Sequence, residues 1–351
     1  MRTPGLSQLT RLGIALGGLR CRRGATLSNL TAIGVDKVWA QGITGPGIVV
    51  GIADSGVDGH HPALSGAYRT GDDSWYDPWN GSRFPTDDSG HGTHVLGSAV
   101  GGNGIGVAPG ARWIGCVDLP RNLGNPAGYL RCLQFMLAPF GYGGDALRDG
   151  RPDRAADILI NSWACPELEG CDSGALRPAI RALTQAGIFV VAAAGNSGPR
   201  CDTITVPPAP YPEAFTVGAV DRDGRVAGFS SRGAAPRPGT APRNGTAPGT
   251  AVAIGKPNLV APGVGVVSAL PGGGYGAMDG TSMAAPQVAG VVALLWAADP
   301  TLVGDVIRTR DLLQRTAAPI TTSTDPGCGR RADGGAGIVD ADAAVRTARN
   351  R

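Results

Sequence analysis

Short apolar runs alternate with segments of helical periodicity along most of the chain. Apolar runs of five or six residues that end at glycine or at a polar residue predict buried strands. Segments in which apolar residues recur every three or four positions predict helices. The predicted strands are 48–53, 113–117, 157–161, 188–193 and 215–220, and the predicted helices are 91–100, 129–137, 176–186, 288–298 and 303–315.

The alternation of strand and helix predicts an α/β fold with three layers, in which helices cover both faces of a mainly parallel central sheet. Right-handed crossovers place successive helices on these faces. One domain is predicted over 30–346, after a leader at 1–29 and before a tail at 347–351. The leader is expected to be disordered or the remnant of a signal or propeptide. The stretch 234–255, rich in Pro, Gly and Thr, predicts a surface insertion.

Composition and charge narrow the class of partner. The chain has 351 residues, a formal net charge of +3 and no dense basic stripe, so nucleic acid is not an expected partner. No apolar run reaches the roughly 18 residues that a membrane span needs, so no span is predicted. The apolar patch at 14–19 is interrupted by glycine and no A-x-A site follows it, which makes the start of the chain a poor signal peptide.

The chain has seven cysteines, and none are spaced C-x-x-C, so a zinc knuckle is not predicted. Cys21 lies in the leader, and the other six allow 15 full pairings. Disulfides, which an even count in an exported domain favours, and buried free thiols both stay open. Cys116 with Cys132 is one candidate pair. Three other cysteines flank strands 157–161 and 188–193: Cys165, Cys171 and Cys201. Disulfides there would crosslink the rim of a cleft.

Ser282 stands just before the apolar helix 288–298, among small residues. A helix N-terminus presents free backbone N–H groups and the positive end of the helix dipole, which stabilise an oxyanion. A serine hydroxyl is a weak nucleophile that needs a base and an orienting acid. His91 opens a predicted helix and is the candidate base. Asp54 follows strand 48–53 at the carboxyl edge of the sheet and is the candidate acid. The alternative for Ser282 alone is a helix N-cap.

Three segments in this order resemble the signature blocks of the subtilisin-like serine peptidases: DSG at 54–56, HGTHVLG at 91–97 and GTSMAAP at 280–286. The order of acid, base and nucleophile is the one known for subtilisin. The resemblance runs from about residue 30 to about residue 346 and implies a subtilisin-like fold. The segments similar to bacillopeptidase F-type members are VAPGA at 107–111, INSW at 160–163, YPEAFTVGA at 211–219, FSSRG at 229–233 and VAPG at 260–263.

The resemblance implies roles for further residues. Asn196 matches the side-chain donor of the oxyanion hole, and the Ser282 backbone N–H would be the second donor. Two preset donors of this kind stabilise the negative charge of a tetrahedral intermediate. The residues that match the edge against which the substrate backbone pairs are Ser162, Trp163 and Ala164, and those that match the wall of the pocket for the residue before the cut bond are Ala193, Ala194 and Gly195.

Departures from the family pattern bear on the cleft and on cofactors. Gln287 stands where members often have a histidine, outside the catalytic roles. Ala164 replaces the usual glycine, which is expected to narrow the cleft. The stretch 101–106 is shorter than the calcium-binding loop of the family, so a structural calcium there is doubtful. No cofactor is expected for catalysis, and no metal site is predicted.

Three of the four histidines are expected to have no catalytic role. His94 lies three residues after His91, but no acidic third ligand is near it in sequence, so a zinc site is disfavoured. His94 is expected to be hydrogen-bonded within its helix. His60 and His61 are expected to face solvent.

The predicted function is a serine endopeptidase that hydrolyses protein or peptide substrates through an acyl-enzyme. We expect a secreted monomer. Two alternatives stay open: a dedicated peptide-processing or transpeptidating enzyme of the same fold, and a catalytically silent binding protein. An α/β-hydrolase esterase is disfavoured, because its order would require a histidine after the serine and none follows Ser282.

Overall fold

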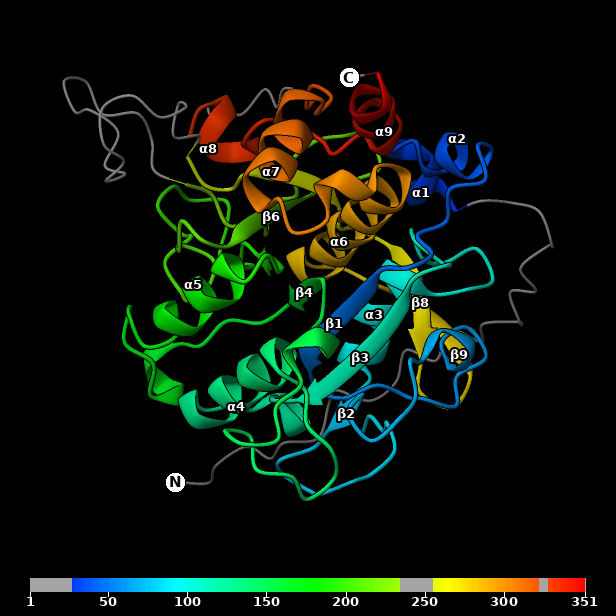
Figure 1. Ribbon diagram of the computed structural model, residues 1–351. Coiled ribbons are helices and arrows are strands. Elements are labelled where there is room, and N and C mark those ends of the chain that lie inside the picture. The colour runs from blue at the N-terminus through cyan, green and yellow to red at the C-terminus, as the bar shows by residue number, and fades with distance from the viewer. Residues whose placement is uncertain (1–26, 234–254, 322–327, 351) are drawn as a thin grey trace, which may run out of the picture.

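The computed structural model describes residues 27–233, 255–321 and 328–350 (Figure 1). Residues 1–26 of the predicted leader and the predicted insertion, apart from Gly255, lie outside the described residues.

A seven-stranded parallel sheet forms the centre of the described part, in the order β2-β3-β1-β4-β5-β6-β7. The inner strands are buried at nearly every position, as expected for a parallel sheet that is covered on both faces. The predicted three-layer α/β fold is confirmed. The strands are β1 (Val49–Asp54), β2 (Trp75–Tyr76), β3 (Arg112–Val117), β4 (Ile158–Asn161), β5 (Phe189–Ala193), β6 (Phe215–Val220) and β7 (Leu259–Pro262).

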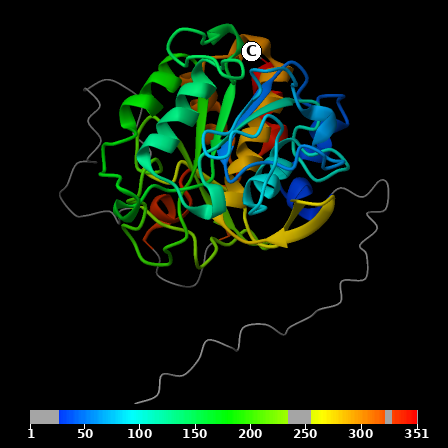
Figure 2. The same ribbon diagram turned by 90° about the horizontal axis from the view of Figure 1, so that it is seen from below.

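Helices form the two outer layers. Alternate side chains of β1 point to opposite faces of the sheet: Val50 and Ile52 join the larger core cluster, whereas Ala53 joins the smaller one. Helices α3 and α6 lie on the larger face, and α4 and α5 lie on the other (Figure 2). The helices of the described residues are α1 (Ser28–Ala32), α2 (Val35–Trp39), α3 (His91–Val100), α4 (Pro126–Leu137), α5 (Arg177–Gln185), α6 (Thr281–Ala298), α7 (Val306–Arg315), α8 (Arg330–Gly334) and α9 (Ala341–Arg349).

The predicted elements are present, and their ends differ for local reasons. All five predicted strands occur with ends within one residue of the prediction. Helix α3 has the predicted bounds. Helix α4 begins at Pro126 rather than at residue 129, because the Asn125 side chain accepts a hydrogen bond from the Gly128 N–H and caps the helix. Helix α7 begins at Val306, because Asp305 caps it in the same way through the Arg308 N–H.

Four strands were not predicted. β2 has only two residues, and β7 ends in a proline, so neither shows a clear strand pattern. β8 (Val266–Leu270) and β9 (Gly274–Met278) form an antiparallel hairpin that packs beside α3. The exposed strand β9 contains two glycines, which weaken the strand signal.

Helix α6 is longer than predicted and begins at Thr281. It is apolar on all sides because it is buried on all sides, between the sheet, α3 and α9. By length and composition alone α6 is long enough to cross a membrane, yet 83% of it is buried inside the protein, as for the core helix of a globular domain. Its first turn carries Ser282.

The two ends of the described chain meet beside α6 (Figure 1). Helix α9 packs against α2 and α6, and the Ala341 N–H donates to the Ile33 carbonyl oxygen at 2.8 Å. The predicted domain boundary at residue 346 falls inside α9, in which Ala348 is still buried. The packed part of the chain therefore extends beyond residue 346.

Candidate active site

Asp54 and His91 form a close pair at the carboxyl edge of the sheet. Asp54 is the last residue of β1 and is 1% exposed, and its Oδ1 lies 2.7 Å from His91 Nδ1. The Ser55 N–H also donates to Asp54 Oδ1, at 2.7 Å. Burial lowers the pKa of His91, but the Asp54 and Asp87 carboxylates more than offset this, so the pKa of His91 lies above its usual value of 6.5.

Hydrogen bonds around Ser55 hold the helix of His91 against the strand of Asp54. Ser55 Oγ donates to Asp87 Oδ1 at 3.0 Å and accepts from the Gly92 N–H at 2.9 Å. Gly92 also permits the close approach of α3 to β1, since a Cβ there would lie 2.1 Å from a carbonyl oxygen of the loop after Asp54. The DSG and HGTH blocks thus contain the residues that lock the pair together.

Ser282 and Ser162 exchange two hydrogen bonds. Ser282 Oγ donates to the Ser162 carbonyl oxygen at 2.9 Å, and Ser162 Oγ donates to the Ser282 carbonyl oxygen at 3.0 Å. Pro286 explains why the Ser282 carbonyl oxygen has no backbone partner within α6 and is open to Ser162. A non-proline residue there would donate its N–H to the carbonyl four residues earlier, which is that of Ser282. The Ser282 hydroxyl thus donates to Ser162 and not to His91. This does not conflict with a catalytic role, because catalytic hydrogen bonds are often long until substrate binds.

Asn196 lies against the start of α6 with its amide oriented. Its Oδ1 accepts from both the N–H and the hydroxyl of Thr281, each at 3.0 Å. Nδ2 has no hydrogen-bond partner in the described segments and lies beside Gly280, where a Cβ would be 3.6 Å from it. Gly280 has a φ of 153°, a conformation that favours glycine. The Ser282 N–H has no hydrogen-bond partner among the described residues, so both predicted oxyanion donors are available.

The segment predicted to pair with substrate follows directly after β4. Ser162 and Trp163 are buried and Ala164 is half-buried. The Trp163 side chain is a packing group: its Nε1 donates to the Ala53 carbonyl oxygen at 2.9 Å, and its ring stacks on Tyr129. Only backbone atoms of Trp163 are thus available for pairing.

The predicted pocket wall follows β5. Ala193 ends that strand, and Ala193 and Ala194 are both buried. Gly195 has a φ of 99°, and its N–H donates to Thr281 Oγ1 at 3.1 Å. The chain therefore turns sharply at Gly195 and brings Asn196 to α6.

A hollow next to the DSG block was not predicted from the sequence. A hollow of about 370 Å³ opens beside Ser55 and is lined by Val117, Arg121, Leu123 and Trp79, among others. The loop 118–124 has no regular hydrophobic period, and the pairing of β3 with β1 brings it beside Ser55. Thr281, which orients Asn196, was missed as well, although it stands inside the GTSMAAP block.

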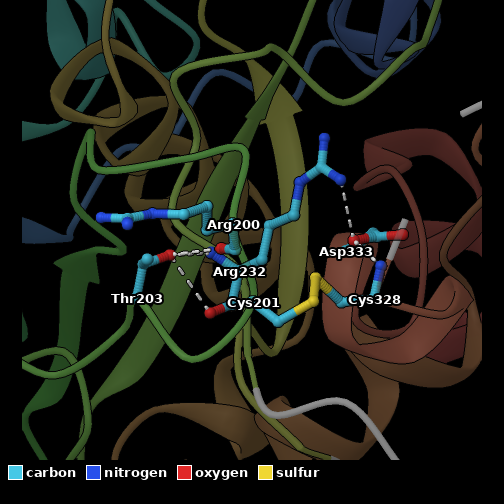
Figure 3. Close-up of a disulfide and its surroundings, with 6 residues drawn as sticks. All are labelled: Arg200, Cys201, Thr203, Arg232, Cys328 and Asp333. Carbon is cyan, nitrogen blue, oxygen red and sulfur yellow. Dashed lines mark hydrogen bonds and ion pairs between the residues drawn. A yellow bond between two sulfur atoms is a disulfide. The ribbon is translucent and has the colours of Figure 1, made fainter. Parts of the chain in front are cut away.

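A disulfide ties the loop that follows Asn196 to the C-terminal part of the chain (Figure 3). Cys201 in that loop is bonded to Cys328, and Arg232 pairs with Asp333 at 3.3 Å beside it. The candidate pair of the sequence analysis, Cys116 with Cys132, is confirmed. The disulfides of the described residues are Cys116–Cys132, Cys165–Cys171 and Cys201–Cys328.

Among the other histidines, His60 is exposed as expected, and the expectations for His94 and His61 need correction. His94 is buried, but its Nε2 contacts the carbonyl oxygens of Val266 and Gly276 in the β8–β9 hairpin rather than its own helix. Burial lowers the pKa of His94 to about 4. The expectation that His61 faces solvent is wrong: His61 is fully buried, with Nε2 2.8 Å from the Gly274 carbonyl oxygen. Backbone carbonyl groups of the β8–β9 hairpin supply these partners, and the sequence around the histidines does not indicate this hairpin.

The stretch 101–106, in which a structural calcium was doubted, follows α3 directly. It carries no carboxylate, and the carbonyl oxygen of Gly101 accepts from the Gly106 N–H at 2.9 Å in a tight turn after α3. Asn103 donates its side-chain amide to the Tyr275 hydroxyl at 3.1 Å. Among the described residues, no group of three or more His, Cys, Asp or Glu is arranged to hold a metal.

An acid, a histidine and a serine in this chain order, at the carboxyl edge of a parallel sheet, are the features of the subtilisin-like class of serine peptidases. The description "Subtilase family" belongs to the family model that matches residues 45–339. The chain belongs to the subtilase family.

Individual relatives agree with this family. The chain is 37% identical to bacillopeptidase F of Bacillus subtilis (strain 168) over 317 residues, which is 85% of this chain and 20% of that protein. It is 31% identical to subtilisin E of the same strain over 300 residues, or 84% of this chain and 66% of that protein. It is also 31% identical to subtilisin of Bacillus pumilus, over 84% of this chain and 92% of that protein. The chain thus spans one fifth of bacillopeptidase F.

Proposed function

We propose that this chain is a serine endopeptidase in which Asp54, His91 and Ser282 form the catalytic triad. The observation that carries the proposal is the contact of 2.7 Å between Oδ1 of the buried Asp54 and His91 Nδ1. An aspartate on Nδ1 fixes the tautomer in which the other ring nitrogen, Nε2, accepts a proton. The raised pKa of His91 fits a general base that works near neutral pH.

Acylation begins when His91 Nε2 takes the Ser282 hydroxyl proton. Ser282 Oγ then attacks the carbonyl carbon of the peptide bond, and the carbonyl π electrons move onto its oxygen. Collapse of this tetrahedral intermediate breaks the C–N bond, and the imidazolium of His91 gives its proton to the leaving amine. Asp54 stays ionised and stabilises the imidazolium. In deacylation, water replaces the amine, with His91 again as base.

Asn196 Nδ2 and the Ser282 N–H are proposed to hold the oxyanion. The two bonds from Thr281 fix the amide of Asn196 before substrate arrives, so no reorganisation is needed when charge develops. The first turn of α6 adds the positive end of its helix dipole. Removal of one such donor costs about 10²–10³ in turnover.

The proposed substrates are proteins or peptides in extended form. The backbone of Ser162, Trp163 and Ala164, which directly follows β4, is proposed to pair with an added strand of substrate. Ala193, Ala194 and Gly195 are proposed to wall the pocket for the residue before the cut bond. Three disulfides among the described residues support export to an oxidising compartment. We also propose that the enzyme is a monomer.

Hydrolysis of casein by a Ser282→Ala variant tests the proposal. Loss of the nucleophile of a cooperating triad lowers turnover by roughly 10⁶. Ser65→Ala, at an exposed serine, is the matched control and keeps full activity. Wild-type rates in Ser282→Ala would exclude the assignment. Mass analysis of products formed with an added amine separates hydrolysis from transpeptidation.

A further inference from the structure

Asp118 is a fully buried carboxyl group immediately behind the acid of the proposed triad. It follows the last residue of β3, and its N–H donates to the Asp54 backbone carbonyl oxygen at 3.0 Å. Its exposed fraction is 0%, and neither side-chain oxygen has a hydrogen-bond partner among the described residues. A buried carboxyl without donors is costly in its ionised form.

Within the described part of the chain, the charged groups that act on Asp118 are all negative. The charged groups that act on it are Asp54 from β1 and Glu169 from the loop after β4, and both are acids. Tyr129 of α4 completes this cluster, and its hydroxyl donates to Glu169 Oε2 at 2.6 Å. Trp163 stacks on Tyr129 and helps to close the cluster from water.

An ionised Asp118 would repel the charge of Asp54, so the two carboxyl groups are compared by the hydrogen bonds that each accepts. Asp54 Oδ1 has two partners, the Ser55 N–H and His91 Nδ1, each at 2.7 Å. Hydrogen bonds of this kind favour the ionised form, and Asp118 has none on its side chain among the described residues. The proton therefore belongs on Asp118, whose side chain accepts no hydrogen bond from the described residues.

We propose that Asp118 is a positioning residue that keeps a proton while Asp54 carries the single negative charge that orients His91. This inference rests on the proposed function. Burial first, and then the Asp54 charge, raise the pKa of Asp118 well above its usual value, and they outweigh the opposing effect of the Asp118 backbone N–H.

Loss of that proton disturbs the site at alkaline pH. Ionised Asp118 is a second buried negative charge without a partner, and only contact with water can stabilise it. The end of β3 therefore opens, and the ordered Asp54–His91 pair is lost. Asp118→Asn has the same shape and never ionises. It is expected to keep kcat/KM within about threefold of wild type at pH 8 and to hold its activity to higher pH than wild type.

Infrared difference spectroscopy tests the protonation state without relying on activity. The wild-type minus Asp118→Asn spectrum at pH 8 is expected to contain the C=O stretch of a protonated carboxyl group. Asp118→Leu, a neutral apolar variant, removes the same band if Asp118→Asn folds poorly. Asp153→Asn, at an exposed aspartate, is the control and is expected to remove only carboxylate bands. A carboxylate signal for Asp118 at pH 8 overturns the proposal.

The rate of Ser282 labelling by a fluorophosphonate, measured against pH, tests the role. Wild type and Asp153→Asn are expected to lose labelling at the same alkaline pH. Asp118→Asn is expected to lose it only at a higher pH. Identical alkaline limbs in wild type and Asp118→Asn contradict a positioning role. If wild type is not labelled at all, the proposed function fails, and the infrared result still decides the protonation state.

Discussion

Thr281 donates both its backbone N–H and its hydroxyl to Oδ1 of Asn196, each at 3.0 Å. The same hydroxyl accepts from the Gly195 N–H at 3.1 Å, so Thr281 fixes both the backbone and the side chain at this turn. The side chain at Thr281 is fully buried. The oxyanion donor of the proposed mechanism is therefore held by a neighbour of the nucleophile.

Thr281→Val keeps the shape and the backbone donor but removes the hydroxyl. One neutral hydrogen bond contributes about 1 kcal/mol, so kcat is expected to fall about three- to tenfold. KM stays unchanged, because the oriented amide acts in the transition state. Steady-state kinetics on a peptide substrate measure both constants, with Thr281→Ser as the control that restores the hydroxyl. A rise in KM with constant kcat would show that Thr281 serves substrate binding instead.

The Ser162 hydroxyl and Pro286 form a second testable pair. Ser162→Ala leaves the Ser282 carbonyl oxygen without its donor and is expected to cost about 1 kcal/mol in the free energy of unfolding. In a Pro286→Ala background, the new backbone N–H supplies that donor, so Ser162→Ala costs less. Urea unfolding of the four proteins of this double-mutant cycle measures the coupling. Strict additivity of the two changes would refute the link.

The pH dependence of the reaction reports the state of His91. The base must be neutral, and the net effect of burial, Asp54 and Asp87 raises the pKa of His91 above 6.5. The value of kcat/KM is therefore expected to rise with pH through a midpoint above 6.5. A midpoint below 6.5 contradicts this balance of charges. NMR titration of the His91 ring in the inactive Ser282→Ala variant provides the same pKa without turnover.

The raised pKa of His91 also links pH to stability. Protonated His91 beside Asp54 stabilises the fold fully below the unfolded pKa of about 6.5, and this contribution is lost as pH rises through the folded pKa. Asp118 adds a second loss in the alkaline direction, because its unfolded form ionises near pH 4 while the folded form keeps its proton. The raised pKa values of His91 and Asp118 therefore both predict that the free energy of unfolding falls toward alkaline pH.

The three disulfides are expected to contribute unequally to stability. Cys201–Cys328 spans 127 residues and Cys165–Cys171 spans 6. Loop-closure entropy then predicts losses of about 5 and about 2 kcal/mol when each pair is replaced by serine. Thermal unfolding of the two double-serine variants measures the difference. Equal shifts in Tm would exclude chain entropy as the main cause.

The elements that the sequence predicted well are those with a local signal. β1, β4 and β5 are continuous apolar runs, because both faces of a parallel strand are buried. The β8–β9 hairpin was missed because its partner surface is α3, which lies far away in sequence. Such a strand shows no alternation that a short window can detect.

The difference between local and tertiary signals also explains which residues of the candidate site were predicted. The blocks around Asp54, His91 and Ser282 carry their own supporting residues, so motif order sufficed to propose their roles. Asp118 gave no signal, because it became relevant only when β3 paired with β1 and α4 closed over its end. The carbonyl partners of His61 and His94 were likewise set by tertiary contacts.

Mass spectrometry of the protein after treatment with a fluorophosphonate tests the central claim most directly. An activated serine forms one covalent adduct, and the claim is that Asp54 and His91 activate Ser282. The account predicts a single adduct on the peptide that contains Ser282 in wild type, and none in His91→Ala or Ser282→Ala. An adduct of equal rate on Ser282 in His91→Ala, or an unlabelled and well-folded wild type, would contradict it.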